Sequence, residues 1–173
     1  MKVAGLKTAQ ITALLALSLM LLTCGCATFG EERPQAPVTA ADFNLKLAGG
    51  GEATLSQFKG RPLVINFGAS WCPHCQNELP ALKKGYDKYK GQVEFLVVFL
   101  KSPEKDVTDL IEKNSIEFKV GLDPEAQVGK AYGVKGFPIT YFIDGDGNVV
   151  DDYFGGIAES TLSKKIDSLL KKK

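Results

Sequence analysis

Two cysteines separated by two residues are the most reactive feature of this 173-residue chain. Cys72 and Cys75 lie in the run Trp71-Cys72-Pro73-His74-Cys75, which holds the only histidine and the only tryptophan of the sequence. A strand-like apolar run at 62–67 precedes them, and a helix-like pattern follows. At this spacing and at the start of a helix, two cysteines can close a small disulfide ring and open it reversibly. The motif therefore predicts thiol-disulfide exchange.

The expected positions of the two sulfurs give them different roles. At a helix N-terminus, unpaired backbone N–H groups and the positive end of the helix dipole stabilise a thiolate, which is the form that attacks disulfides. Cys72 is therefore the expected nucleophile. Cys75 lies one turn further along, where it is more buried, and would displace the product from the mixed disulfide. Cys75 is the expected resolving thiol.

The N-terminal residues have the pattern of an export signal. Lys2 and Lys7 flank the start of an apolar run at 11–22, which is long enough for a signal-peptide core but short for a membrane-spanning helix. The segment 21–26 then resembles a bacterial lipoprotein processing site. We expect residues 1–25 to be a signal peptide and the mature protein to be extracytoplasmic, in the periplasm or at the cell surface.

The expected membrane anchor is a lipid on Cys26. This cysteine follows a glycine, whereas Cys24 follows a threonine, which suits processing less well. Secretion as a soluble protein is the alternative. Residues 26–41 consist mostly of Ala, Thr, Glu, Pro, Gln and Gly and have no helical or strand period. They predict a flexible tether in front of one domain at 42–173.

The charge balance argues against a nucleic-acid partner. The chain has 21 Lys and Arg residues against 20 Asp and Glu residues, and loss of Lys2 and Lys7 with the signal leaves 19 basic residues. Proteins that bind nucleic acids usually carry a basic surplus. We expect no nucleic acid among the partners.

The cysteine count argues against a metal or haem site. Processing at Cys24 and Cys26 leaves only Cys72 and Cys75 in the domain, so the four ligands that zinc normally takes are not available as cysteines. Covalent haem attachment needs a histidine directly after the second cysteine, where this chain has Gln76. We expect no metal and no cofactor. In an exported protein, a lone close-spaced pair is more typical of catalysis than of a structural framework.

The surrounding pattern predicts an α/β fold. Residues 43–58 suggest a hairpin or an edge element around three consecutive glycines. Beyond them, strand-like and helix-like segments alternate, which indicates sheet and helix layers, and the last two strands are joined too tightly to be parallel. The expected strands are 62–67, 93–100, 139–143 and 148–153, and the expected helices are 73–89, 104–114, 124–132 and 159–171.

Over residues 37–173 the chain resembles the thioredoxin superfamily, and within it the extracytoplasmic TlpA/ResA-like thiol-disulfide oxidoreductases. Residues 67–75 are similar to the strand-to-helix active-site segment of that family, Glu78 and Pro80 match its acidic and helix-kinking positions, and 136–138 matches its cis-proline loop. The resemblance implies a thioredoxin fold, with a central mixed β-sheet flanked by helices. It also implies an extra helical insertion before the cis-proline strand.

The resemblance also assigns a role to Glu78. In the family, an acid at this position lies under the active site and influences the proton chemistry of the cysteines, so we assign Glu78 as a general base toward Cys75. Asn66 occupies the place of the buried acid of thioredoxin, so that proton acceptor is absent. A surface glutamate on a solvated helix is the alternative.

Pro73 and His74 are expected to tune the redox potential. The imidazole can hydrogen-bond or attract the Cys72 thiolate, which lowers the cysteine pKa and makes the protein more oxidising. The Pro-His pair also resembles the active site of the DsbA oxidase, but only 37 positions separate Lys101 from Pro138, too few for the helical domain of DsbA. The charge of Glu78 opposes His74, which leaves the net potential open, and an imidazole without influence is the alternative.

The expected substrate-binding residues are Trp71, Phe137 and Pro138. A cis bond before Pro138 would leave the Phe137 backbone free to pair with an extended substrate peptide. A trans proline that begins a strand is the alternative. Trp71 would give the substrate an apolar contact, or else serve as an ordinary core or rim aromatic.

Together these features predict a monomeric, membrane-anchored oxidoreductase that exchanges disulfides with cysteine-containing exported proteins. The resemblance suggests a reductase, with apocytochrome c as one substrate and a membrane thiol-disulfide protein as electron donor. A net oxidase or isomerase is one alternative, and a non-catalytic binding lipoprotein with this fold is another. The threonine-cysteine signature of the related peroxiredoxins is not found, so we do not expect peroxidase activity.

Overall fold

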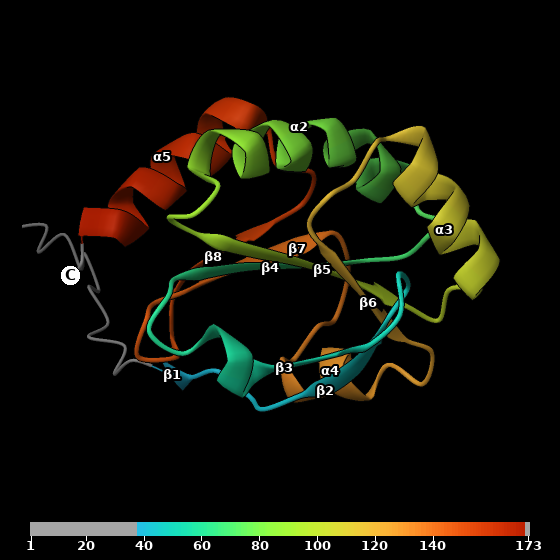
Figure 1. Ribbon diagram of the computed structural model, residues 1–173, viewed down its shortest axis with the longest axis horizontal. Coiled ribbons are helices and arrows are strands. Elements are labelled where there is room, and N and C mark those ends of the chain that lie inside the picture. The colour runs from blue at the N-terminus through green and yellow to red at the C-terminus, as the bar shows by residue number, and fades with distance from the viewer. Residues whose placement is uncertain (1–37, 172–173) are drawn as a thin grey trace, which may run out of the picture. The chain divides into compact units, whose positions relative to one another are not determined.

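The computed structural model describes residues 38–171, and these residues build one sheet with helices on both faces (Figure 1). The sheet has eight strands in the order β1-β8-β7-β4-β5-β6-β2-β3. The strands are β1 (Val38–Thr39), β2 (Asn44–Leu47), β3 (Glu52–Thr54), β4 (Leu63–Gly68), β5 (Glu94–Leu100), β6 (Lys119–Asp123), β7 (Ile139–Ile143) and β8 (Asn148–Phe154). The helices are η1 (Leu55–Phe58), α2 (Pro73–Tyr89), α3 (Glu104–Lys113), α4 (Gln127–Ala131) and α5 (Glu159–Lys171).

The centre of the sheet is mixed in direction. β4 pairs in parallel with β5 and antiparallel with β7, and β5 pairs in parallel with β6. Every residue of β4 is buried, as is all of β5 except its first residue. Strands that are buried on both faces have continuous apolar sequences, which is why β4 and β5 could be predicted from the sequence.

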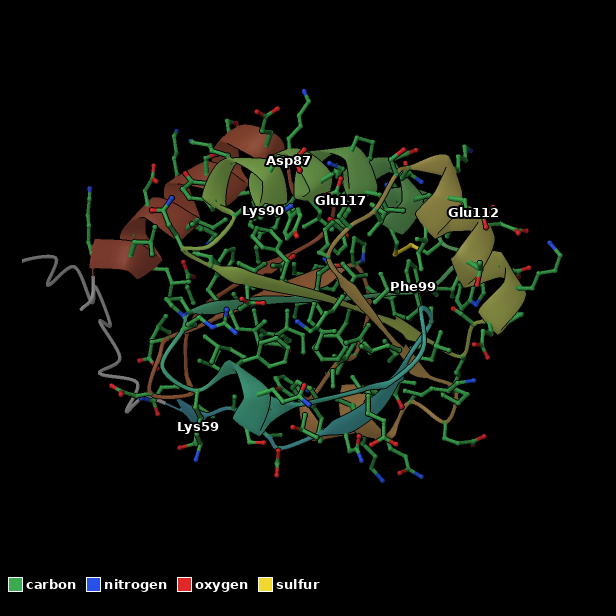
Figure 2. All side chains as sticks on the ribbon, viewed as in Figure 1. Lys59, Asp87, Lys90, Phe99, Glu112 and Glu117 are labelled. Atoms are coloured by element: carbon green, nitrogen blue, oxygen red, sulfur yellow. A yellow bond between two sulfur atoms is a disulfide. The ribbon has the colours of Figure 1, made fainter. Side chains whose placement is uncertain are left out.

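Two apolar layers hold the sheet, one on each face. The helices α2, α3 and α5 cover one face (Figure 1). On the other face, η1, α4 and side chains of the β2–β3 hairpin at the edge of the sheet pack against the central strands. Alternate side chains of β4 enter the two layers, so that Val64 packs under the helices and Ile65 packs on the opposite side. Side chains fill both interlayer spaces, and Phe99 of β5 lies in the layer under the helices (Figure 2).

The α/β class, the β2–β3 hairpin and the antiparallel β7–β8 pair are confirmed. Strand β6 was not predicted, because Gly121 and Asp123 interrupt its apolar pattern. Helix α4 is shorter than the predicted 124–132. It begins only after Ala126, whose φ of 54° is left-handed and therefore outside the helical region.

Pairing with the sheet is present from residue 38, four residues before the expected start of the domain at residue 42. Val38 and Thr39 pair with β8, and the N–H group of Ala40 donates to the Gly147 carbonyl over 2.9 Å. A strand of two residues is too short to show a period, so the tether was expected to extend over 26–41. The folded domain therefore includes Val38 and the residues that follow it.

The expected signal peptide at 1–25, the lipidation site Cys26 and the first part of the tether lie outside the described residues. None of the helices within 38–171 combines the length and the hydropathy needed to cross a lipid bilayer.

Candidate active site

The cysteine pair lies where β4 passes into α2. β4 ends at Gly68, and Cys72 follows in an extended conformation as the N-cap of α2, with Pro73 as the first helical residue. Proline suits this position because its missing N–H group would have no partner there. A side chain at Gly68 would place its Cβ 3.1 Å from the Cβ of Cys75, so the strand can pass this close to the cysteine because residue 68 is a glycine.

Cys72 and Cys75 form a disulfide, with their Cα atoms 5.3 Å apart. Both are buried, with 6% of Cys72 and 2% of Cys75 exposed. The backbone N–H of Cys75 donates to the sulfur of Cys72 over 3.2 Å. In the reduced protein this donor stabilises a thiolate at Cys72. The contact supports the predicted division into nucleophile and resolving thiol.

Pro73 and His74 are exposed beside the disulfide. The imidazole of His74 makes no hydrogen bond with any residue from 38 to 171. The predicted effect of His74 on the Cys72 thiolate therefore stays a prediction, and no contact in the described part of the chain supports it.

Glu78 is buried beneath the start of α2, with 4% of its surface exposed, which excludes a solvated surface glutamate. One carboxylate oxygen accepts a hydrogen bond from the Asn66 amide over 3.0 Å, and the other accepts from the backbone N–H of Ile157 over 2.8 Å. Burial dominates and raises the pKa of Glu78 to about 7, against the hydrogen bonds from Ile157 and Asn66, which lower it.

A carboxyl group with this pKa can take up and release a proton near neutral pH. Glu78 follows Cys75 by three residues on α2, so the two side chains lie on neighbouring parts of one helix face. The arrangement suits Glu78 to accept the proton of the Cys75 thiol. The Asn66 amide also donates to the hydroxyl of Thr140 over 3.0 Å. The sequence did not indicate Thr140 and Ile157 as members of this group, because both lie in segments distant along the chain.

The Phe137–Pro138 peptide bond is cis, as the resemblance implies. Pro138 is buried, and its carbonyl accepts a hydrogen bond from the Gly155 N–H over 2.8 Å. The Phe137 side chain packs against the cluster formed by Ala69, Cys72 and Cys75. The loop therefore places Phe137 next to the cysteine pair.

Trp71 forms part of the rim, with 61% of its surface exposed, so it is not a core residue. Its indole ring meets the Phe137 ring edge-on with centroids 5.3 Å apart, and its N–H donates to the Lys101 carbonyl over 3.4 Å. Phe154, which the sequence did not single out, is 67% exposed. It lies against Gly136, so exposed aromatic side chains flank the cis-proline loop on both sides.

Among residues 38–171, no three His, Cys, Asp or Glu side chains lie close enough together to hold a metal ion. The described site contains two sulfurs, a buried carboxyl group and a rim of exposed aromatic side chains.

Comparison with known proteins identifies relatives of this chain. The AhpC/TSA family matches residues 37–152. The thiol-disulfide oxidoreductase ResA of Geobacillus thermodenitrificans is 32% identical over 146 residues, which cover 83% of this chain and 84% of that protein. The thioredoxin-like protein YneN of Bacillus subtilis is 29% identical over 140 residues, or 79% of each chain.

A solved structure shares the fold as well. The protein assigned as the thiol:disulfide interchange protein DsbE of Chlorobium tepidum superposes with a TM-score of 0.72 at 30% identity, over 78% of this chain and 96% of that one. The mixed sheet with its flanking helices is thus a thioredoxin fold. The chain belongs to the AhpC/TSA family of the thioredoxin superfamily and is a ResA-like thiol-disulfide oxidoreductase.

Proposed function

We propose that the protein is a membrane-tethered, extracytoplasmic reductase of disulfides in exported proteins. The observation that carries the proposal is the buried carboxyl group of Glu78, hydrogen-bonded beneath a disulfide that caps the N-terminus of α2. A binding protein that only retained the fold would have no use for a titratable group buried at this point.

The reaction begins with the reduced protein. The Cys72 thiolate attacks one sulfur of a substrate disulfide, forms a mixed disulfide and releases one substrate thiolate. Glu78 takes the proton of Cys75, and the Cys75 thiolate attacks the sulfur of Cys72. This step releases the second substrate thiolate and leaves the Cys72–Cys75 disulfide. Two electrons have passed to the substrate, and an external dithiol must return two electrons to the protein.

The charges at the site favour the reducing direction. An ionised Glu78 raises thiol pKa values, which disfavours thiolates and makes the dithiol a stronger electron donor. His74 would act in the opposite sense, but its imidazole makes no hydrogen bond within residues 38–171. A net oxidase or isomerase remains the second candidate, because the Pro-His pair between the cysteines is also found in DsbA.

The rim supports a protein substrate. Trp71 and Phe154 are exposed apolar surfaces, and Phe137, which precedes the cis-proline, would offer its backbone to an extended peptide. Exported proteins with cysteine pairs, among them apocytochrome c, fit this surface. The proposed electron donor is a membrane thiol-disulfide protein, reached through the lipid anchor at Cys26 and a tether up to residue 37.

Insulin reduction tests the enzymatic function. The full-length protein in detergent should accelerate the reduction of insulin by dithiothreitol, and a Cys72→Ser variant should not. Equal rates for the two would favour a non-catalytic binding protein.

Two measurements test the direction and the substrates. Equilibration with defined thiol buffers should give a potential near that of thioredoxin, about −270 mV, whereas a value near that of DsbA, about −120 mV, would favour an oxidase. A Cys75→Ala variant expressed in the cell should accumulate mixed disulfides on Cys72. Mass spectrometry of these adducts identifies the partners.

A further inference from the structure

A pocket of about 170 Å³ opens beside the active-site rim. Its lining includes Trp71, which directly precedes Cys72, and Phe137, which packs against the cysteine cluster. One wall comes from Leu100 and Lys101 at the end of β5, and the other from Val134 and Lys135 before the cis-proline loop.

The pocket combines apolar walls with two lysines. Lys101 and Lys135 are exposed, and neither forms an ion pair with any residue from 38 to 171. Other lysines on the described surface do form ion pairs, such as Lys46 with Glu104. Two cations without an ion-pair partner at one pocket attract a negatively charged group, and because both are exposed the attraction is modest and weakened by salt.

The backbone around this pocket is held in an uncommon conformation. Among residues 38–171, only three non-glycine residues have a positive φ, and two of them, Lys101 at 47° and Ala126 at 54°, line the pocket. Left-handed backbone costs about 1–2 kcal/mol at such residues, so contacts elsewhere must maintain it.

Those contacts converge on Asp123. Its backbone carbonyl accepts hydrogen bonds from the N–H groups of Lys101 and Ala126 over 3.1 and 3.0 Å, and its carboxylate caps α4 through the N–H groups of Gln127 and Gly129, each over 2.9 Å. The carboxylate of Asp123 is buried, its hydrogen bonds go to these backbone N–H groups, and it forms no ion pair with Lys101 or Lys135. The pocket is thus shaped before a ligand arrives.

We propose that this pocket binds an acidic side chain, glutamate or aspartate, close in sequence to the substrate cysteine that reacts with Cys72. An extended substrate paired with the Phe137 backbone would run along Gly136 and Lys135, which brings its side chains to the pocket. The apolar walls contact the methylene groups of the acid, and Lys101 and Lys135 contact its carboxylate. The inference rests on the proposed exchange function and adds a substrate preference to it.

Matched peptides test the preference. Each peptide carries one cysteine, joined by a disulfide to 2-mercaptoethanol, and glutamate or glutamine at one position within three residues on either side. The reduced full-length protein in detergent is mixed with each peptide, and the Trp71 fluorescence follows the reaction. At one or more positions glutamate should react about fivefold faster than glutamine at low ionic strength, and added salt should reduce the ratio.

Variants locate the effect. A K101Q/K135Q double variant should lose the preference for glutamate, and Lys164→Gln, the same charge change at an exposed position of α5, should keep it. The uncharged reagent bis(2-hydroxyethyl) disulfide should react equally with all three proteins. A Cys72→Ser variant gives the background from other thiols.

The possible failures are distinguishable. Equal rates for glutamate and glutamine peptides would overturn the proposal that the pocket binds an acidic side chain, and so would a preference for glutamate that survives in K101Q/K135Q. In either case, continued reaction with the uncharged reagent would leave the exchange function intact. Loss of reaction with every disulfide overturns the exchange function itself. A change of oligomeric mass in K101Q/K135Q, measured by sedimentation, would show that a second copy of the chain occupies the pocket and would also overturn the proposal.

Discussion

The side-chain amide of Asn66 lies 3.0 Å from a carboxylate oxygen of Glu78. Asn66 belongs to the central strand β4 and Glu78 to the helix that carries the cysteines, so this contact joins the sheet to the active-site helix. The same amide nitrogen lies 3.0 Å from the hydroxyl oxygen of Thr140 on β7. Because an amide nitrogen only donates, it favours the ionised carboxylate, while burial favours the neutral acid.

Replacing Glu78 should slow the second half of the reaction. Glu78→Gln preserves the size of the side chain but removes the proton acceptor for Cys75, so release of substrate from the Cys72 mixed disulfide should slow by roughly 100-fold near pH 7. Rapid-quench measurement of a preformed mixed disulfide gives this rate. Glu159→Gln, at an exposed acid of α5, is the matched control and should not change it. An unchanged rate in Glu78→Gln would remove this residue from the mechanism.

The stability of the oxidised protein should fall as the pH rises from about 4.5 to 7. The folded pKa of Glu78 is raised to about 7 from an ordinary value of 4.5, so in this range the folded state binds a proton that the unfolded state has lost. The contribution of Glu78 to the free energy of unfolding is therefore complete below pH 4.5 and is lost above pH 7.

Chemical denaturation at several pH values checks this dependence in the wild type and in Glu78→Gln. The difference between the folded and unfolded pKa values of Glu78 corresponds to about 3 kcal/mol. Between pH 4.5 and pH 8 the free energy of unfolding of Glu78→Gln should therefore rise by up to this amount relative to that of the wild type. The same stability difference at both pH values would show that Glu78 titrates normally in the folded protein.

The two thiols of the reduced protein should differ in reactivity. Cys72 caps α2 and accepts a hydrogen bond from the Cys75 N–H, whereas Cys75 is more deeply buried beside Gly68. At pH 7, iodoacetamide should therefore modify Cys72 about 10-fold faster than Cys75. Peptide mass spectrometry at short reaction times gives both rates. Equal modification of the two residues would contradict the assignment of nucleophile and resolving thiol.

A methyl group at position 68 should disturb the cysteines directly. In Gly68→Ala the new Cβ would lie 3.1 Å from the Cβ of Cys75 and 3.3 Å from its sulfur, so one of the two elements must shift. We expect a loss of about 1–3 kcal/mol of stability and slower closure of the disulfide. Gly49→Ala is the control, because its Cβ would meet no atom within 4 Å. Wild-type stability in Gly68→Ala would show that the strand tolerates a side chain there.

Local patterns predicted most of the fold, and contacts between distant segments account for the rest. Helix α2 was predicted at its observed bounds because the cysteine cap, Pro73 and an apolar stripe coincide. Strand β6 was missed because its burial depends on β5 and β2 rather than on its own composition.

The candidate site divides in the same way. Residues close together in the sequence, such as Trp71, Cys72 and Cys75, could be predicted as site residues from their types and spacing. The burial of Glu78 followed only from the resemblance, because its partner Ile157 lies 79 residues away. The pocket beside Trp71 could not be predicted, since it depends on the left-handed backbone of Lys101 and Ala126, and neither residue type favours that conformation.

The chain enters the sheet at the end of β8 that is remote from the cysteines. Val38 pairs with Val149 near the start of β8, whereas Phe154 at the other end of that strand lies beside the cis-proline loop, roughly 17 Å further along. A surface that holds the domain by its N-terminal chain is therefore attached at the end remote from the sulfurs. If the proposed tether holds the domain at a membrane, a donor in that membrane meets the reactive end only when the domain rotates on the tether.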